Sequence, residues 1–168
     1  MAYVNYEYYR SLYAESEIEE TVFNRLSYDA CRRIDRITTG VDEVKKLKVA
    51  FPTDEDDAEA VKRCACKIID IMLNIQEAEK RVNTSKDYMT RNDGTLQGKV
   101  ITSVSSGNES ITYSSNGSGT TLIDKVLSDK NAQEKLYRDT IIEYLSGIGD
   151  ANGVNLLYMG PYPYIKTR

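Results

Sequence analysis

The clearest pattern in this sequence is an apolar stripe at helical spacing between residues 16 and 40. At 100° per residue its members fall within about half of the helix circumference, which predicts an amphipathic helix with one buried face. The stripe consists of Ile18, Val22, Phe23, Leu26, Ala30, Ile34 and Ile37. Ser16 is a suitable N-cap with Glu19 three residues later, and Thr39-Gly40 is a typical stop signal. We therefore expect a capped helix that the other helices cover.

The opposite side of this helix is predicted to face outward, and it is rich in arginine. The outward positions are Thr21, Arg25, Tyr28, Arg32, Asp35 and Arg36. Positive charge near the C-terminal end complements the helix dipole, so a solvated face is one interpretation. A contact surface for an acidic partner is the other, and the sequence leaves both open.

A second long helix is expected from Thr53, its predicted N-cap, to about residue 82. Its first turn is acidic and contains Asp54, Glu55, Asp56 and Asp57. Carboxylates there stabilise the free N–H groups of the helix start, although a subunit salt bridge or a cation site would use the same residues. The apolar face consists of Val61, Ala65, Ile68, Ile69, Met72, Leu73 and Ile75. If the two long helices pack antiparallel, this acidic turn meets the arginine-rich half of the first helix.

Shorter elements are expected at both ends of this pair and in an insertion. Residues 1–13 contain five tyrosines and predict a short helix, in which Tyr8 and Tyr9 either cover the core or contact another subunit. Residues 84–121 are rich in Ser, Thr, Asn and Gly, and their β-rich runs predict a hairpin that needs support from helices or neighbouring chains. A last helix is expected from Ser128 or Asp129 to Gly147.

The sequence ends in a tyrosine- and proline-rich segment, residues 154–168, that we expect to be extended. A frayed terminus and a segment that docks onto another protein are both consistent with it, and its tyrosine content favours docking. The candidate docking residues are Tyr158, Pro161, Tyr162, Pro163, Tyr164 and Ile165. The whole pattern predicts a mainly α single domain over residues 1–168. We expect an antiparallel helical bundle of two long helices and shorter N- and C-terminal helices, with a β-hairpin insertion and an extended tail.

Composition narrows the possible functions. The chain has 168 residues, a net charge of -4, three cysteines and no histidine. The lack of histidine excludes imidazole catalysis, Ser-His and Cys-His nucleophile pairs and histidine-containing metal sites. No apolar run approaches the ~18 residues that a bilayer requires, and no export signal precedes the first helix, so we expect reduced thiols and synthesis in the cytoplasm. With no catalytic constellation in view, we expect neither enzyme activity nor a cofactor.

The first forty residues resemble the start of head-tail connector (adaptor) proteins of long-tailed bacteriophages. The resemblance rests on a tyrosine-rich short helix, with Tyr6-Glu7-x-Tyr9 and Tyr13, followed by the run from Arg25 to Thr38. The family pattern F-x-x-L-x-x-x-A-x-x-x-I-D-x-x-T corresponds here to Phe23, Leu26, Ala30, Ile34, Asp35 and Thr38. An acidic-headed second helix, a Ser/Tyr-rich middle segment and a Leu-Tyr-Met-Gly end follow in the order that the family shows.

This resemblance implies a structural virion protein that forms a ring, expected to be dodecameric, between the portal and the neck or tail. It would be assembled in the bacterial cytoplasm, extend the DNA channel without reading DNA sequence, and contact the portal and the next connector, stopper or tail protein. Our candidates for subunit contacts are Arg25, Arg32, Arg36, Asp54, Asp56, Asp57, Tyr8 and Tyr9. The alternative hypothesis is a small carboxylate-based enzyme or a cation-binding helical bundle that uses Asp54, Asp56 and Asp57.

Overall fold

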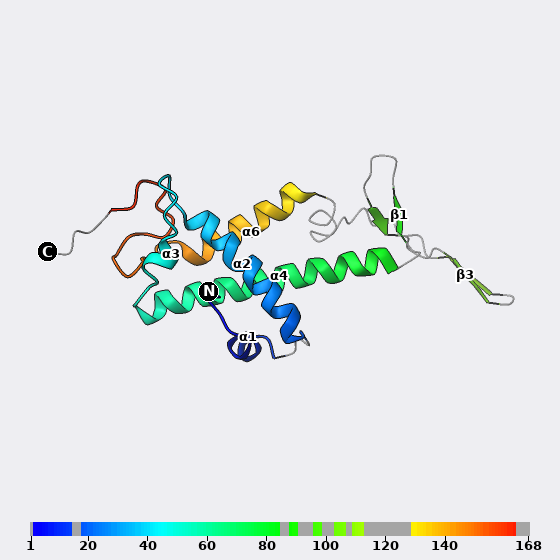
Figure 1. Cartoon of the computed structure of the whole chain (residues 1–168). Coiled ribbons are helices and arrows are strands. Elements are labelled where there is room, and N and C mark those ends of the chain that lie inside the picture. The colour runs from blue at the N-terminus through cyan, green and yellow to red at the C-terminus, as the bar shows by residue number, and fades with distance from the viewer. Residues whose placement is uncertain are drawn as a thin grey trace. The chain divides into compact units, whose positions relative to one another are not determined.

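The structure is a computed structural model that describes residues 2–14, 18–84, 88–90, 96–98, 103–106, 109–112 and 129–163. The described chain is mainly helical, as expected, with five helices (Figure 1). It divides into two compact units, Met1–Leu73 with Lys135–Arg168, and Asn74–Glu134. The predicted insertion therefore falls in the second unit, and every surface discussed below belongs to the first.

The N-terminal part of the first unit contains α1 (Tyr6–Leu12) and α2 (Glu20–Thr38). The Asn5 side chain caps α1 by accepting a hydrogen bond from the Tyr8 backbone N–H at 2.8 Å. The start predicted for α2 is wrong, because the helix begins at Glu20 and Glu19 is its N-cap without a side-chain cap hydrogen bond. Ser16 lies outside the described residues, whereas the predicted stop is confirmed by the end of α2 at Thr38.

Two further helices follow, α3 (Lys46–Val49) and α4 (Glu55–Thr84). The N-cap of α4 is Asp54 rather than the predicted Thr53. Its Oδ1 accepts hydrogen bonds from the backbone N–H groups of Asp56 and Asp57 at 3.0 and 3.2 Å. A carboxylate in this position adds a favourable interaction with the helix dipole to the hydrogen bonds, which explains why it replaces the neighbouring hydroxyl.

The remaining helix, α6 (Lys130–Leu145), starts after Asp129, as predicted. Asp129 Oδ1 accepts a hydrogen bond from the Asn131 N–H at 2.8 Å. The helix is followed by Gly147, whose φ of 81° is in the left-handed region that glycine adopts without steric cost.

Among its described residues, the second unit has four short strands in two antiparallel pairs. Strand β1 (Tyr88–Thr90) pairs with β2 (Leu96–Gly98), with Met89 opposite Gln97. Strand β3 (Ser103–Ser106) pairs with β4 (Glu109–Thr112), with Ser103 opposite Thr112.

The core of the first unit combines the apolar faces predicted for the long helices. On α2, Phe23, Leu26 and Ile34 are each at most 1% exposed, and each contributes about 1.5–3 kcal/mol relative to an exposed position. On α4 the predicted face is buried except at half-buried Leu73. Helix α2 crosses α4 in Figure 1, and Cys31 on α2 lies near Cys64 on α4.

Candidate interaction surfaces

The first polar cluster of the unit ties the N-terminal segment to α2 through Asp35. We predicted Asp35 on the solvent-exposed face, and this is wrong, because the residue is only 6% exposed. Its carboxylate accepts a hydrogen bond from Tyr3 Oη and pairs with the Lys48 ammonium at 3.3 Å. Burial and the neighbouring carboxylate both raise the pKa of Tyr3 above its usual value. Asp35 therefore holds the structure together and is not available to a partner.

A second polar cluster is built around Lys46, which is fully buried. Its ammonium donates hydrogen bonds to the carbonyl oxygens of Leu156, at 3.0 Å, and Tyr158. Burial lowers the pKa of Lys46. Because a buried ammonium is costly unless its donors are satisfied, these carbonyls make Lys46 an anchor for the C-terminal part of the chain. Nothing in the sequence pattern around residues 45–49 distinguished this lysine from its exposed neighbours.

The anchored segment, which we call the C-terminal strap, comprises residues 150–162. Tyr162 is only 5% exposed, its Oη donates to Asp150 Oδ2 at 2.5 Å, and its N–H donates to Asp42 Oδ2 at 2.6 Å. The Val41 N–H donates to the Met159 carbonyl at 3.0 Å. The Tyr162 N–H lowers the pKa of Asp42, while burial and the Asp150 carboxylate raise that of Tyr162.

The predicted extended tail therefore differs from the structure over most of its described length. Residues 154–162 fold onto their own unit, since Val154, Leu156 and Tyr162 contribute side chains to the core. Of the candidate docking residues, Tyr162 is used within the chain, whereas Tyr158, Pro161 and Pro163 are exposed. Tyr164 and Ile165 lie outside the described residues.

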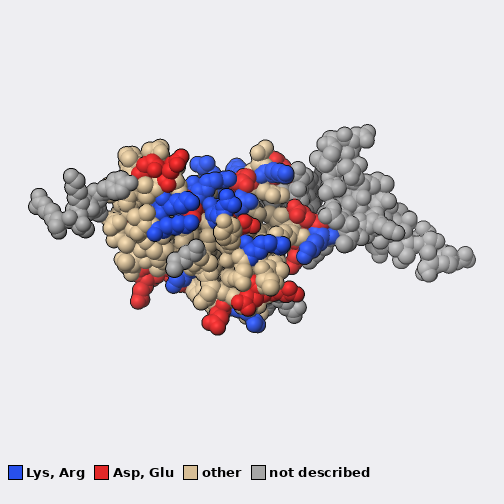
Figure 2. Space-filling view, in the orientation of Figure 1, with Lys and Arg blue, Asp and Glu red and all other residues tan. Residues whose placement is uncertain are grey.

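The arginine-rich face of α2 is exposed, as predicted, and we call Arg25, Tyr28, Arg32 and Arg36 the basic stripe. Tyr28 is 63% exposed, and the Arg32 guanidinium lies 5.9 Å from the centre of its ring. Figure 2 shows Lys and Arg side chains gathered in the middle of this face, over α2. By contrast, the Arg33 guanidinium turns towards α6 and lies over the Tyr137 ring at 4.1 Å.

We call Asp54–Asp57, the four acidic residues at the start of α4, the acidic turn. Their carboxylates differ in contacts and exposure. Asp54 is the N-cap, and Asp57 Oδ2 accepts a hydrogen bond from the Gly149 N–H at 3.2 Å. Glu55 and Asp56 are exposed and make neither of these contacts. The capping interpretation is thus confirmed for Asp54, whereas Glu55 and Asp56 remain accessible to a partner.

Of the two N-terminal tyrosines that we proposed as subunit contacts, Tyr9 is buried and Tyr8 is half-buried. Tyr9 is fully buried and packs against Tyr13 and Phe23, with ring centres at 5.0 and 5.4 Å. It covers the core, so the alternative of a subunit contact is wrong for this residue. Tyr8 is half-buried and donates from Oη to Glu59 Oε1 at 2.5 Å on α4. Burial and this carboxylate raise the pKa of Tyr8 to about 12.

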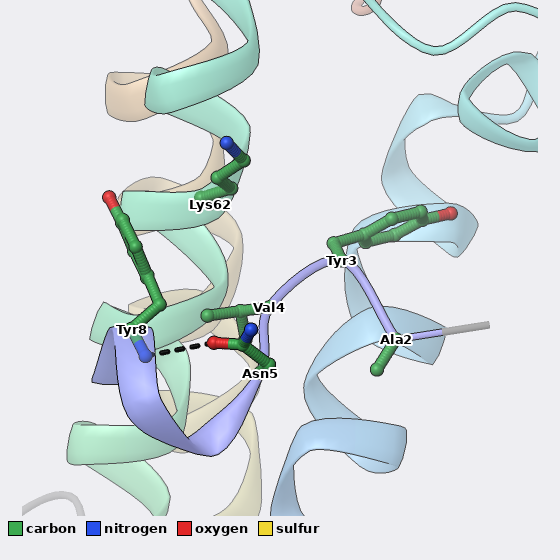
Figure 3. Close-up of a pocket in the computed structure, with 6 residues that line it drawn as sticks. All are labelled: Ala2, Tyr3, Val4, Asn5, Tyr8 and Lys62. Atoms are coloured by element: carbon green, nitrogen blue, oxygen red, sulfur yellow. Dashed lines mark hydrogen bonds between the residues drawn. The ribbon is translucent and has the colours of Figure 1, made fainter. Parts of the chain in front are cut away.

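A cavity of about 370 Å³ opens beside the N-terminal segment and is lined by Ala2, Tyr3, Val4, Asn5, Tyr8 and Lys62 (Figure 3). Its polar groups do not converge on a common point. The Tyr3 ring points away from Tyr8 and Lys62, and Asn5 Oδ1 already caps α1. The Lys62 ammonium lies 5.8 Å from the centre of the Tyr8 ring. The cavity offers no arrangement that would orient a charged ligand.

The thiols and carboxylates were the remaining candidates for chemistry. All three cysteines are free and buried, and burial raises the pKa of Cys64 and Cys66 to about 12, so they are not thiolates at neutral pH. Among the described residues, no group of three or more His, Cys, Asp or Glu side chains could hold a metal ion. Nor is any helix in the described part long and apolar enough to cross a membrane.

Comparison with known proteins adds no assignment to these surfaces. Neither protein-family models nor curated proteins nor solved structures gave a match to this chain. The class that the fold itself defines is a mainly helical protein, whose described surface includes a basic stripe, an acidic turn and the C-terminal strap.

Proposed function

We propose that this chain is a head-tail connector protein of a long-tailed bacteriophage or a phage-like particle. Its copies form a ring between the portal and the neck or tail, extend the DNA channel, and offer a platform to the next connector, stopper or tail protein. In this proposal the helices form an antiparallel bundle, and residues 84–121 form a β-hairpin insertion that neighbouring chains support.

The observation that carries the proposal is the connector-like pattern along α2. The six residues that define this pattern are all buried. They are Phe23, Leu26, Ala30, Ile34, Asp35 and Thr38. The two polar members are satisfied inside the unit, since Asp35 binds Tyr3 and Lys48 and the Thr38 hydroxyl donates to the Ile34 carbonyl at 3.0 Å. A pattern in which every member packs or bonds internally is typical of a scaffold and supports a structural role.

The alternative of a carboxylate enzyme or a cation site receives less support from the acidic turn that it would use. Asp54 and Asp57 accept hydrogen bonds from backbone N–H groups, which explains the presence of carboxylates at these positions without an ion. Glu55 and Asp56 alone are too few ligands for Ca²⁺, which takes six to eight oxygens, and Mg²⁺ requires near-octahedral coordination.

We further propose that the C-terminus docks on the portal, with the strap holding its base. Tyr158, Pro161 and Pro163 are exposed on either side of the anchored Tyr162, so they are accessible to a partner. An extended segment with alternating side chains can add to an exposed sheet edge of a partner, because backbone hydrogen bonds then supply affinity.

Truncation after Tyr162 tests the docking proposal. A chain that lacks residues 163–168 keeps Tyr162 and its contacts with Asp42 and Asp150, so its melting temperature should equal that of the full chain. It should no longer co-purify with a phage portal protein. A matched deletion of residues 161–168 removes Tyr162 as well and should lower the melting temperature. If the protein truncated after residue 162 still co-purifies with portal rings at the yield of the full chain, docking by residues 163–168 is refuted.

A further inference from the structure

We infer that the basic stripe of α2 binds the acidic turn of α4 from a second copy of this chain. The inference rests on the proposed ring and names the contact that closes it. Such a contact is heterologous, because one patch of each protomer meets a different patch of the next, and its repetition gives a closed ring when the rotation between neighbours closes.

The basic side of the contact is a continuous strip on one helix. Arg25, Arg32 and Arg36 are spaced by seven and four residues, which places them along one face over about 16 Å of helix. Tyr28 lies between them and is 63% exposed, an unusual position for a large aromatic side chain. Arginine and tyrosine are the residue types enriched at the centres of protein interfaces, so this strip has the composition of a docking surface.

The acidic side is defined by what the fold leaves accessible in the first turn of α4. Asp54 and Asp57 bind backbone groups of their own chain, whereas Glu55 and Asp56 are exposed beside them. Figure 2 shows the basic side chains over α2 and an acidic cluster at the edge of the same face where α4 begins. The two patches are therefore separate surfaces of one protomer, which a heterologous contact requires.

Charge complementarity identifies the partner as a second copy. An exposed arginine strip favours an acidic partner, and this chain itself has an acidic turn in which Glu55 and Asp56 are exposed. Each exposed ion pair supplies under about 1 kcal/mol, so several pairs together with burial of the Tyr28 ring are needed for a stable contact. The pairs then set the register between subunits, and raising the salt concentration to about 1 M, where the screening length falls to about 3 Å, should weaken assembly.

Two complementary charge reversals test the contact. One variant carries Arg32→Glu and Arg36→Glu, and the other carries Glu55→Lys and Asp56→Lys. Each variant alone places like charges at the contact, so particle mass should show no ring at concentrations where the wild-type chain is fully assembled. A one-to-one mixture of the two variants has opposite charges at every contact and should recover particles of wild-type mass. Arg138→Glu with Asp139→Lys, at exposed positions of α6, is the matched control and should assemble normally.

The outcomes separate this contact from the proposed function. Rings that persist in both reversed variants, or a mixture that fails to recover them while melting temperatures are unchanged, overturn the contact and leave the ring itself in place. A wild-type chain that stays monomeric both alone and when co-expressed with its portal overturns the ring and the contact together.

Discussion

At the scale of single residues, Asp35 shows how a polar side chain becomes part of the core. Its position on α2 is outward by helical period, yet the N-terminal segment and Lys48 cover it. A buried carboxylate is tolerated because Tyr3 Oη and the Lys48 ammonium replace the water it has lost. Asp35 is one of the residues that resemble the connector pattern. Its buried contacts give a structural explanation for a carboxylate at this position.

Replacing Asp35 with Ala should lower the free energy of unfolding by about 2–3 kcal/mol, because it removes hydrogen bonds to a charged acceptor and leaves Tyr3 Oη without its partner. Urea unfolding measures the change. Asp29→Ala is the matched control at an exposed position of the same helix and should cost less than about 1 kcal/mol. Equal losses in the two variants would contradict the structural role of Asp35.

The same cluster predicts a pH dependence. Burial and Asp35 raise the pKa of Tyr3 above its usual value of 10.0. Between the usual and the raised value the unfolded chain has released the proton that the folded chain keeps, so stability falls as pH rises. The stability difference between wild type and Tyr3→Phe should therefore be largest at pH 8 and shrink above pH 10. A difference that stays constant in urea unfolding from pH 8 to pH 11 would show that the hydroxyl does not titrate as described.

At the scale of elements, the C-terminal strap depends on a close backbone approach. A Cβ atom added at Gly40 would lie 2.6 Å from the Gly160 carbonyl oxygen, closer than real Cβ contacts allow. The strap and the loop after α2 can meet only because residue 40 has no side chain. The glycine that the sequence marks as a helix stop thus has a second role in packing.

Gly40→Ala should displace the strap and cost about 1–3 kcal/mol, the usual penalty of forcing extra atoms into a packed site. Hydrogen exchange at the Val41 amide, which donates to Met159, should become faster. Gly149→Ala is the matched control, because its nearest neighbours lie 3.8 Å from the added Cβ, and its stability should stay within about 1 kcal/mol of wild type. Unchanged exchange at Val41 in Gly40→Ala would mean that the strap does not depend on this approach.

The sequence predicted the elements with strong local signals and missed those set by distant contacts. The apolar stripes of α2 and α4, the stop at Thr39-Gly40 and the start of α6 at Asp129 are local properties of the chain, and they are confirmed. Burial of Lys46 and Tyr162 depends on partners more than a hundred residues away in the sequence, such as Tyr158 for the lysine and Asp42 for the tyrosine. The helical periodicity of the sequence does not report contacts between residues so far apart.

At the scale of the whole molecule, we propose that the chain functions through contacts with other proteins. The buried pattern on α2 forms part of the core, and contacts with Lys46 and Asp42 hold the strap on the first unit. The basic stripe and the acidic turn give each copy two complementary surfaces. A protein organised in this way is expected to work as a repeated unit of a larger particle.

Native mass measurement of the chain co-expressed with a phage portal protein tests the proposed ring. We expect one complex in which a dodecameric ring of this chain is bound to one portal ring. Removal of residues 163–168 should release the portal from that complex. A chain that is recovered only as a free monomer, with portal rings of unaltered mass beside it, would contradict the account.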